Sequence, residues 1–209
     1  MSRILVLNSS ISGEASVSRV LVADTLAALV AAHPSAVVVE RDLANDPVPH
    51  LLPHTMAGVR SVASTPAEIA ARELSDTLIG EVQAADVIVI GAPMYNFSLP
   101  TTLRSWLDHV LRPGVTFGYV DGAPKGFVAP GKKVIVVEAR GGLYSEGPAM
   151  ALDYQEGYLK QLLGFIGLTD VTFIRAEKIG YGPEARDAAI SGARAEIARV
   201  VGEQVPLAA

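Results

Sequence analysis

Three short stretches of the chain carry residues that could bind a ligand, and each one follows an apolar run. Residues 92–100 hold two aromatic rings and an amide between two prolines, residues 8–18 are rich in hydroxyl groups, and residues 138–144 contain two adjacent glycines. Aromatic faces suit a flat ring, and hydroxyl groups at the start of a helix suit an anion. Glycines let the backbone approach a ligand closely. Together the three stretches predict a site for one large flat ligand that carries a phosphate.

The hydroxyl-rich stretch places Ser10, Ser12, Ser16 and Ser18 in front of an apolar helical pattern. The first N–H groups of a helix have no partner within the helix, so these groups and the serine hydroxyls can hold an anion. No lysine lies in this stretch, so a phosphate there would be bound mainly by neutral donors. Ordinary helix capping by Ser16 or Ser18 is the alternative, and it needs only one serine.

In the aromatic stretch, Tyr95, Asn96 and Phe97 offer ring faces and backbone N–H groups within one loop. Such a loop can stack against a flat heteroaromatic ring and form hydrogen bonds to the edge of that ring. Pro93 and Pro100 bracket the loop and restrict its conformations, which favours a preformed site. The alternative is that the two aromatic side chains only cover the apolar core.

In the glycine-rich stretch, Gly141 and Gly142 allow the backbone to lie close to the edge of a ligand. Arg140 could place a positive charge beside that ligand. For the Arg140 side chain, however, the sequence favours the simpler expectation of an exposed arginine on a turn.

The composition is that of a folded domain. Half of the 209 residues are apolar, charged residues make up 19%, and the net charge of −5 argues against a nucleic-acid-binding surface. Cysteine is absent, which excludes disulfides and thiolate sites, and the histidines lack the spacing of zinc ligands. The first residues do not read as a signal peptide, and no apolar run approaches the roughly 20 residues that span a bilayer. We therefore expect a cytoplasmic protein without membrane insertion.

Apolar runs alternate with helical patterns along the whole chain. Four continuous apolar runs and a weaker fifth predict buried parallel strands at residues 4–7, 37–39, 87–90, 134–137 and 171–174. Apolar residues at helical spacing predict helices around residues 22–30, 66–83, 103–111, 159–166 and 190–201. Thr65 is the expected N-cap of the second of these helices, with Pro66 at its first position.

This alternation predicts a three-layer α/β fold with a parallel sheet and right-handed crossovers. Five strands without a Gly-x-Gly-x-x-Gly motif favour the flavodoxin-like strand order 2-1-3-4-5, in a single domain of residues 1–209. Ligands of such sheets bind beyond the carboxyl ends of the strands, near the point between the first and third strands. Two segments interrupt the alternation. We expect residues 44–65 to be mostly loop with a short helix, and residues 112–131 to be irregular.

Four segments carry a resemblance to a known family: SRILVLNSSI with the later SVS, APMYNFSLPTTLRSWLDHVLRPGVTF, ARGGLYSEGP and LLGFIGLTDVTFIRAEKIGYGPE. Together they make the chain similar to the FMN-dependent NADH-azoreductase family of flavodoxin-like NADH:quinone oxidoreductases. The resemblance covers nearly the whole chain, and the long central segment is its most specific part. It implies a flavodoxin-like fold and a homodimer with one FMN per subunit at the interface.

The resemblance also implies roles for individual residues. It places the FMN phosphate on Ser10, Ser16, Val17 and Ser18, and the flavin ring against Met94, Tyr95, Asn96 and Phe97. It places Ala139, Arg140, Gly141 and Gly142 near the pyrimidine edge of the ring, with Ala139 in place of a serine that is common in the family. The candidate catalytic residues are Asn96, Tyr119 and Tyr144, and no metal is expected.

The implied reaction has two steps, in which NADH or NADPH reduces the bound FMN and a quinone or azo compound then reoxidises it. Two electrons are transferred in each step of this ping-pong scheme. The expected partners are small aromatic substrates and a second copy of the chain. A flavodoxin-type electron carrier, which binds FMN but does not oxidise NADH, is the alternative, and a hydrolase without flavin on the same fold is a third interpretation.

Overall fold

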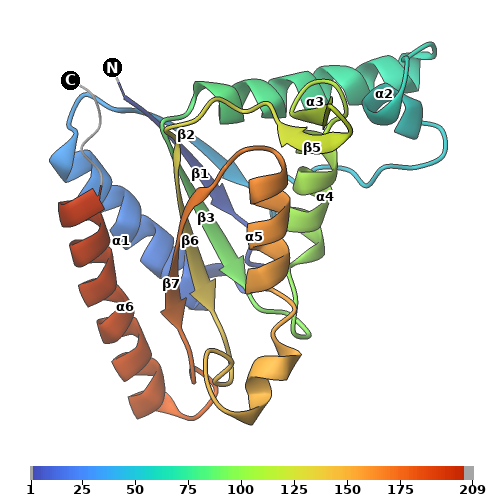
Figure 1. Cartoon of the computed structure of the whole chain (residues 1–209). Helices are drawn as coiled ribbons and strands as arrows, with labels where there is room; N and C mark the ends of the chain where they lie inside the picture. Colours follow the sequence, from blue (N-terminus) through green and yellow to red (C-terminus); the bar gives the residue numbers. More distant parts are fainter. Residues whose placement is uncertain (1, 205–209) are drawn as a thin grey trace.

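Five parallel strands form the central sheet of the computed structural model, which describes residues 2–204 (Figure 1). The strands are β1 (Arg3–Asn8), β2 (Val37–Asp42), β3 (Val87–Pro93), β6 (Lys133–Ala139) and β7 (Asp170–Ala176). They lie in the order β2-β1-β3-β6-β7, and every neighbouring pair is parallel. Counted among themselves, these strands have the predicted 2-1-3-4-5 topology. The last two are numbered β6 and β7 because a separate hairpin takes the labels β4 and β5.

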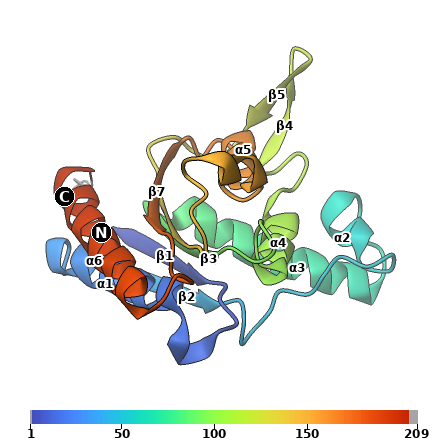
Figure 2. The ribbon, with the colours of Figure 1, turned by 90° about the horizontal axis from the view of Figure 1, so that it is seen from below.

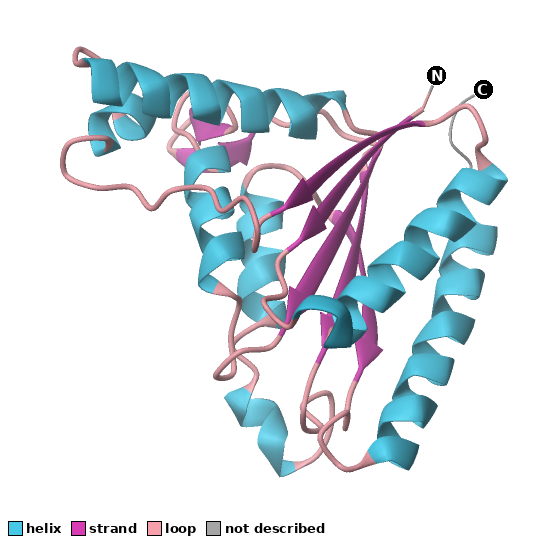
Figure 3. Ribbon diagram, turned by 180° about the vertical axis from the view of Figure 1, so that it is seen from behind, coloured by secondary structure: helices cyan, strands magenta, loops and turns pink. Residues whose placement is uncertain are grey.

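Helices cover both faces of this sheet, as Figures 1 and 3 show from opposite sides. The helices α1 (Val17–Ala32) and α6 (Pro183–Gln204) pack on one face, and α3 (Pro66–Ala84), α4 (Thr101–Val110) and α5 (Glu156–Phe165) pack on the other. The strand β3 is buried along its whole length, with Ile88 and Ile90 in one core cluster and Val87 and Val89 in the other. Burial on both faces explains why its apolar run does not alternate with polar residues.

The start of α3 follows the prediction from the sequence. The Thr65 hydroxyl accepts a hydrogen bond from the Glu68 N–H, the Glu68 side chain accepts one from the Thr65 N–H, and Pro66 lies in the first turn. This capping box satisfies donors that the helix leaves open. The preceding segment is mostly loop with one short helix, α2 (Met56–Arg60), as expected for residues 44–65.

The expectation of an irregular segment at residues 112–131 was wrong for its centre. The strands β4 (Phe117–Val120) and β5 (Ala123–Gly126) form an antiparallel hairpin, which projects from the body of the molecule in Figure 2. The two residues between them, Asp121 and Gly122, have φ angles of 53° and 79°. An Asp-Gly pair is a strong signal for a two-residue hairpin turn, because both turn positions need positive φ. The sequence therefore contained the signal, and the surrounding prolines and glycines obscured it.

Two short 3-10 helices, η1 (Gly13–Ala15) and η2 (Pro148–Leu152), lie in loops that leave the strands β1 and β6. No helix among residues 2–204 is long and apolar enough to cross a membrane. The predicted domain of residues 1–209 includes residues 1 and 205–209, which lie outside the described part of the chain.

Candidate functional site

The three predicted loops meet at the carboxyl edge of the sheet, which is the lower end in Figure 1 and lies away from both termini. The Tyr95 hydroxyl accepts a hydrogen bond from the Ile11 N–H at 3.1 Å and lies 3.3 Å from the Ser10 hydroxyl. The Met94 N–H donates to the Ala139 carbonyl at 2.9 Å. The aromatic loop therefore contacts both the serine loop and the end of β6, so residues of all three stretches share one region.

In the serine loop, capping and the proposed anion site coincide. The Ser16 hydroxyl is the N-cap of α1 and accepts a hydrogen bond from the Arg19 N–H at 3.2 Å. It also lies 3.1 Å from the Ser18 hydroxyl. Ser10, Ser16 and Ser18 are almost completely buried. The capping alternative is thus confirmed for Ser16, while the further hydroxyls and the first N–H groups of α1 provide donors that capping does not require.

An arginine that the sequence reasoning overlooked holds this loop. The Arg19 guanidinium donates to the Ser10 carbonyl at 3.0 Å and pairs with both oxygens of Asp42 at 2.7 and 2.6 Å. The hydrogen bonds from Arg19 lower the pKa of Asp42 to about 2. Asp42 ends β2, the strand next to β1 in the sheet. An acidic residue at the end of the neighbouring strand was the available signal for this pair.

The aromatic loop is a tight turn with a rare backbone conformation. Tyr95 and Ser98 exchange two backbone hydrogen bonds of 3.0 and 3.1 Å, and the residues between them, Asn96 and Phe97, have φ angles of 49° and 70°. Positive φ is strained for a bulky residue such as Phe97, and such strain is concentrated at functional sites. No hydrogen bond within residues 2–204 uses the N–H groups of Asn96 and Phe97. Two donors are therefore presented side by side at the edge of the sheet.

An aromatic pair borders this turn. The rings of Phe97 and Tyr144 lie edge to face, with centroids 6.1 Å apart and planes at 78°. Phe97 is 41% exposed, so part of its surface is open to a ligand. A cavity of about 460 Å³ lies next to Tyr144, lined by Tyr144, Ser145, Met150, Asp153, Glu156, Gly157, Lys160 and Arg175.

The glycine turn is fixed by backbone contacts to the segment after β7. The N–H groups of Lys178 and Gly180 donate to the carbonyls of Gly142 and Gly141 at 2.9 and 3.0 Å. A Cβ atom added to Gly141 would meet no atom within 4 Å, whereas one added to Gly142 would lie 3.1 Å from the Tyr144 ring. The backbone of Gly141 therefore faces open space that a ligand edge can occupy.

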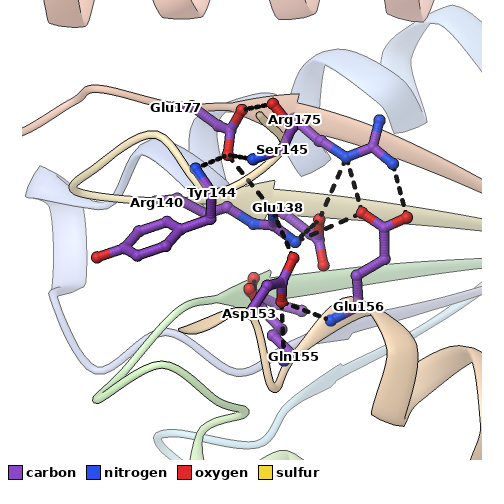
Figure 4. A network of polar contacts seen from close by, with 10 residues as sticks. Glu138, Arg140, Tyr144, Ser145, Asp153, Gln155, Glu156, Arg175 and Glu177 are labelled. Carbon is purple, nitrogen blue, oxygen red and sulfur yellow. Dashed lines mark hydrogen bonds and ion pairs between the residues drawn. The ribbon is translucent and has the colours of Figure 1, made fainter. Parts of the chain in front are cut away.

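The expectation of an exposed Arg140 side chain was wrong. This side chain has no exposed surface, and Figure 4 shows it surrounded by carboxylates. Its guanidinium lies 2.5 Å from Glu138, 3.0 Å from Asp153, 3.5 Å from Glu156 and 3.4 Å from Glu177. Because the guanidinium is directed into this cluster, only the backbone of Arg140 is available to a ligand at the turn.

Burial and charge change the protonation of this cluster. Burial, opposed by the positive charge of Arg140, raises the pKa of Glu138 from 4.5 to about 8. Burial acts in the same direction on Glu177, but its hydrogen bonds from Ser145 and Tyr144, with the charge of Arg140, keep the pKa of Glu177 below its ordinary value. Burial therefore favours the protonated form of Glu138, whereas the hydrogen bonds to Glu177 favour its ionised form.

The third catalytic candidate is not at this edge. Tyr119 lies on the β4–β5 hairpin, where it pairs with Pro124, and it is 70% exposed. The hairpin packs beside the carboxyl end of α5, where a Cβ on Gly126 would collide with Ile166 and Gly167. The other candidates lie near the amino end of that helix. Within one chain, Tyr119 is therefore separated from Asn96 and Tyr144.

Comparison with known proteins identifies the family. The flavodoxin-like fold family matches residues 2–201. The FMN-dependent NADH:quinone oxidoreductase of Hyphomonas neptunium is 58% identical over 200 residues, which are 96% of each chain. The chain belongs to the FMN-dependent NADH:quinone oxidoreductase family. An oxidoreductase of the same name from Azotobacter vinelandii is 49% identical over 202 residues, covering 96% of this chain and 100% of the relative.

A solved structure agrees with this family assignment. The crystal structure of an azoreductase from Bacillus anthracis str. Sterne is 29% identical and superposes with a TM-score of 0.88, over 97% of this chain and 100% of that chain. The residues of the present site fit the cofactor that the relatives' names state. The buried serine hydroxyls suit a phosphate, the two unused N–H groups suit the edge of a heteroaromatic ring, and the open space at Gly141 lets a ligand edge approach the backbone.

Proposed function

We propose that this chain binds FMN at the carboxyl edge of its sheet, oxidises NADH and reduces quinones and azo compounds. The observation that carries this proposal is the meeting of the serine loop, the aromatic turn and the glycine turn at one edge. When bound, FMN supplies hydride and two-electron chemistry that protein side chains lack. Residues 1–209 would form a single domain with this function. The net charge of −5 is low for an electron carrier that binds protein partners through an acidic surface, which favours the enzyme over the carrier.

In this proposal the serine loop holds the phosphate. The hydroxyls of Ser10, Ser16 and Ser18 and the N–H groups of Val17 and Ser18 would hold it at the positive end of α1. Arg19 adds a positive charge beside the loop and fixes the Ser10 carbonyl, so that the donors remain in place before the ligand arrives.

The aromatic turn and the glycine turn hold the ring. The N–H groups of Asn96 and Phe97 would bind one edge of the flavin, and Met94 and Tyr95 would lie beside it. At the other edge the backbone from Ala139 to Gly142 approaches the pyrimidine side. Ala139 contributes no hydroxyl, but its carbonyl already bonds to the Met94 N–H, so its backbone keeps the two turns together. Donors aimed at a ring that becomes more negative on reduction stabilise its reduced form.

The residues around the ring orient substrates rather than transfer protons. Tyr144 and the exposed part of Phe97 form an aromatic wall that suits flat quinone or azo compounds. We further propose a cytoplasmic homodimer. Tyr119 and Val120 are exposed next to each other on the β4–β5 hairpin, and this supports a dimer because contiguous exposed apolar surface marks protein interfaces.

A substitution in the serine loop tests the phosphate assignment. Ser16→Asp places a carboxylate that still caps α1 but repels a phosphate, whereas Ser16→Thr keeps a hydroxyl cap. We expect the affinity for FMN to fall at least about 100-fold in the Asp variant, since one like-charge contact in a partly buried site costs about 3 kcal/mol or more. Flavin absorbance after gel filtration measures the retained FMN. Equal retention by the two variants would exclude the serine loop as the phosphate site.

A reduction experiment separates the enzyme from the two alternative functions. The purified protein is loaded with FMN, mixed anaerobically with NADH or NADPH, and then with menadione. We expect NADH to bleach the flavin absorbance and menadione to restore it. A flavodoxin-type carrier would resist NADH, and a hydrolase without flavin would show no flavin bands after gel filtration.

A further inference from the structure

The cluster around Arg140 consists of that arginine, the acidic residues Glu138, Asp153, Glu156 and Glu177, and a second arginine, Arg175, which lies 2.7 Å from Glu156 (Figure 4). Its members come from three segments: the end of β6, the end of β7 with the residue that follows it, and the start of α5 with the loop before it. The side chains of Arg140 and Glu138 have no exposed surface. The centre of the cluster therefore lies inside the protein, next to the glycine turn, and its other members reach the surface.

Glu177 connects this cluster to the wall of the site. One of its oxygens accepts hydrogen bonds from the N–H groups of Tyr144 and Ser145 at 2.8 and 3.0 Å, and the other accepts one from the Ser145 hydroxyl. The Arg140 guanidinium lies 3.4 Å from the oxygen that both N–H groups share. The position of the Tyr144 backbone is thus fixed by a carboxylate that Arg140 itself orients.

Asp153 connects the same cluster to the opposite side of the wall. It accepts hydrogen bonds from the N–H groups of Gln155 and Glu156 at 2.9 and 3.1 Å, which fixes the start of α5. The next residue along the chain, Tyr154, donates its N–H to the Phe97 carbonyl at 3.1 Å. Tyr144 is therefore bonded directly to a carboxylate that contacts Arg140, and Phe97 is attached to another one through Tyr154.

Apolar residues could fill this place, so stability alone does not explain why charged residues are found there. A buried ion pair is costly to desolvate, and apolar residues of the same volume often stabilise a core as well or better. The Arg140 Nε and one oxygen of Glu138 have no hydrogen-bond partner among the described residues. In Figure 4 the Tyr144 ring points away from the carboxylates, so its backbone is held while its ring remains available.

We propose that Arg140 is a positioning residue for the electron acceptor: acting through Glu177 and Asp153, it fixes the position of the Phe97–Tyr144 aromatic wall, against which a flat acceptor lies. This proposal rests on the function proposed above. In this proposal the cluster determines how well the acceptor is positioned. Binding of FMN depends instead on the serine loop and on the backbone of the two turns.

The test uses Glu177→Gln in the protein loaded with FMN. Glutamine has almost the same shape, but it loses the charge that pairs with Arg140 and one of the two acceptor oxygens. The matched control is Glu81→Gln, because Glu81 also pairs with an arginine, Arg41, and is similarly buried, with 18% of its side chain exposed against 11% for Glu177. Each protein is reduced with dithionite and mixed with menadione or with ferricyanide in a stopped-flow instrument.

We expect Glu177→Gln to retain FMN and to be reoxidised by menadione about tenfold more slowly than the unchanged protein, because a misplaced wall lowers the fraction of productive encounters. Ferricyanide is not flat and does not need the wall, so its rate should change less than about twofold. Glu81→Gln should match the unchanged protein with both acceptors.

Equal losses with both acceptors would show a general structural role and overturn the proposal, and so would unchanged rates with both. Should Glu177→Gln fail to fold, Ser145→Ala removes one donor to Glu177 from an exposed loop. We then expect a two- to threefold loss with menadione alone, and no loss would overturn the proposal. Absence of bound FMN, or of any menadione reaction, in the unchanged protein would instead refute the proposed function.

Discussion

Two arginines hold two loops at the same edge of the sheet, and they do so in different surroundings. Arg19 binds the Ser10 carbonyl and pairs with one carboxylate, Asp42, with 22% and 31% of the two side chains exposed. Arg140 contacts four carboxylates, and neither its own side chain nor that of Glu138 has exposed surface. The serine loop is thus fixed near solvent, and the glycine turn is fixed from within the protein.

The comparison shows how burial changes the consequence of a similar contact. Near solvent, water screens both charges, so the Arg19 pair contributes little free energy and its removal leaves groups that water can solvate. In the interior, removal of one partner leaves uncompensated charge in a poorly solvated place. An arginine–carboxylate contact therefore stabilises the serine loop only weakly, whereas the glycine turn depends on it strongly.

The largest expected difference comes from removing each arginine. Arg140→Met leaves the carboxylate cluster without its central cation and should lower the free energy of unfolding by about 3–5 kcal/mol. Arg19→Met should lower it by only about 1 kcal/mol, from the exposed pair and the bonds to the Ser10 carbonyl. Urea denaturation at neutral pH measures both values. Equal losses would show that burial does not distinguish the two supports.

The second difference concerns alkaline pH. The folded protein keeps a proton on Glu138 up to a pKa of about 8, because burial and the nearby Glu156 and Asp153 outweigh the effect of Arg140, whereas the unfolded chain releases it near 4.5. Between these values the native state binds more protons, so stability falls as the pH rises, by a few kcal/mol in total. Glu138→Gln imitates the protonated acid and should flatten this slope. This variant should be more stable than the unchanged protein at pH 9. Urea denaturation at pH 6 and pH 9 measures the free energy of unfolding of both proteins. A variant that is no more stable than the unchanged protein at pH 9 would contradict the prediction.

The smallest difference concerns acid at the serine loop. The pKa of Asp42 is lowered from 3.8 to about 2, mainly by its hydrogen bonds with Arg19, so the pair contributes above pH 4 and loses its contribution as the pH falls toward 2. Asp42→Asn should cost at most about 1 kcal/mol at pH 7, because both side chains are partly exposed. At pH 3 the difference in free energy of unfolding between this variant and the unchanged protein should become smaller, as measured by urea denaturation. A constant gap would mean that the Asn side chain disturbs the loop by its shape and not by its lack of charge.

The sequence predicted the sheet well because its signals are local or periodic. Continuous apolar runs located the strands, and Thr65 with Pro66 located the start of α3. The three loops were found because strand ends in a parallel sheet share one edge. The hairpin was missed although Asp121 and Gly122 encode its turn, since a two-residue signal was lost among other turn-forming residues.

The supports behind the loops could not be read in the same way. Arg140 looks exposed in sequence because two glycines follow it, yet its partners Asp153, Glu156 and Glu177 come from segments 13 to 37 residues away. No periodicity links such residues, and only the packing of β6, β7 and α5 brings them together. Similarly, Arg19 in the first turn of α1 pairs with Asp42 at the end of β2. Tertiary contacts of this kind decide which polar residue binds a ligand and which holds another residue in place.

A crystal structure of the protein grown with FMN tests the central claim most directly. We expect the phosphate within hydrogen-bond distance of Ser10, Ser16 and Ser18, with the ring beside the N–H groups of Asn96 and Phe97 and its pyrimidine edge at Gly141. Flavin bound elsewhere, or an empty edge with these serines bonded only to each other and to α1, would contradict the account.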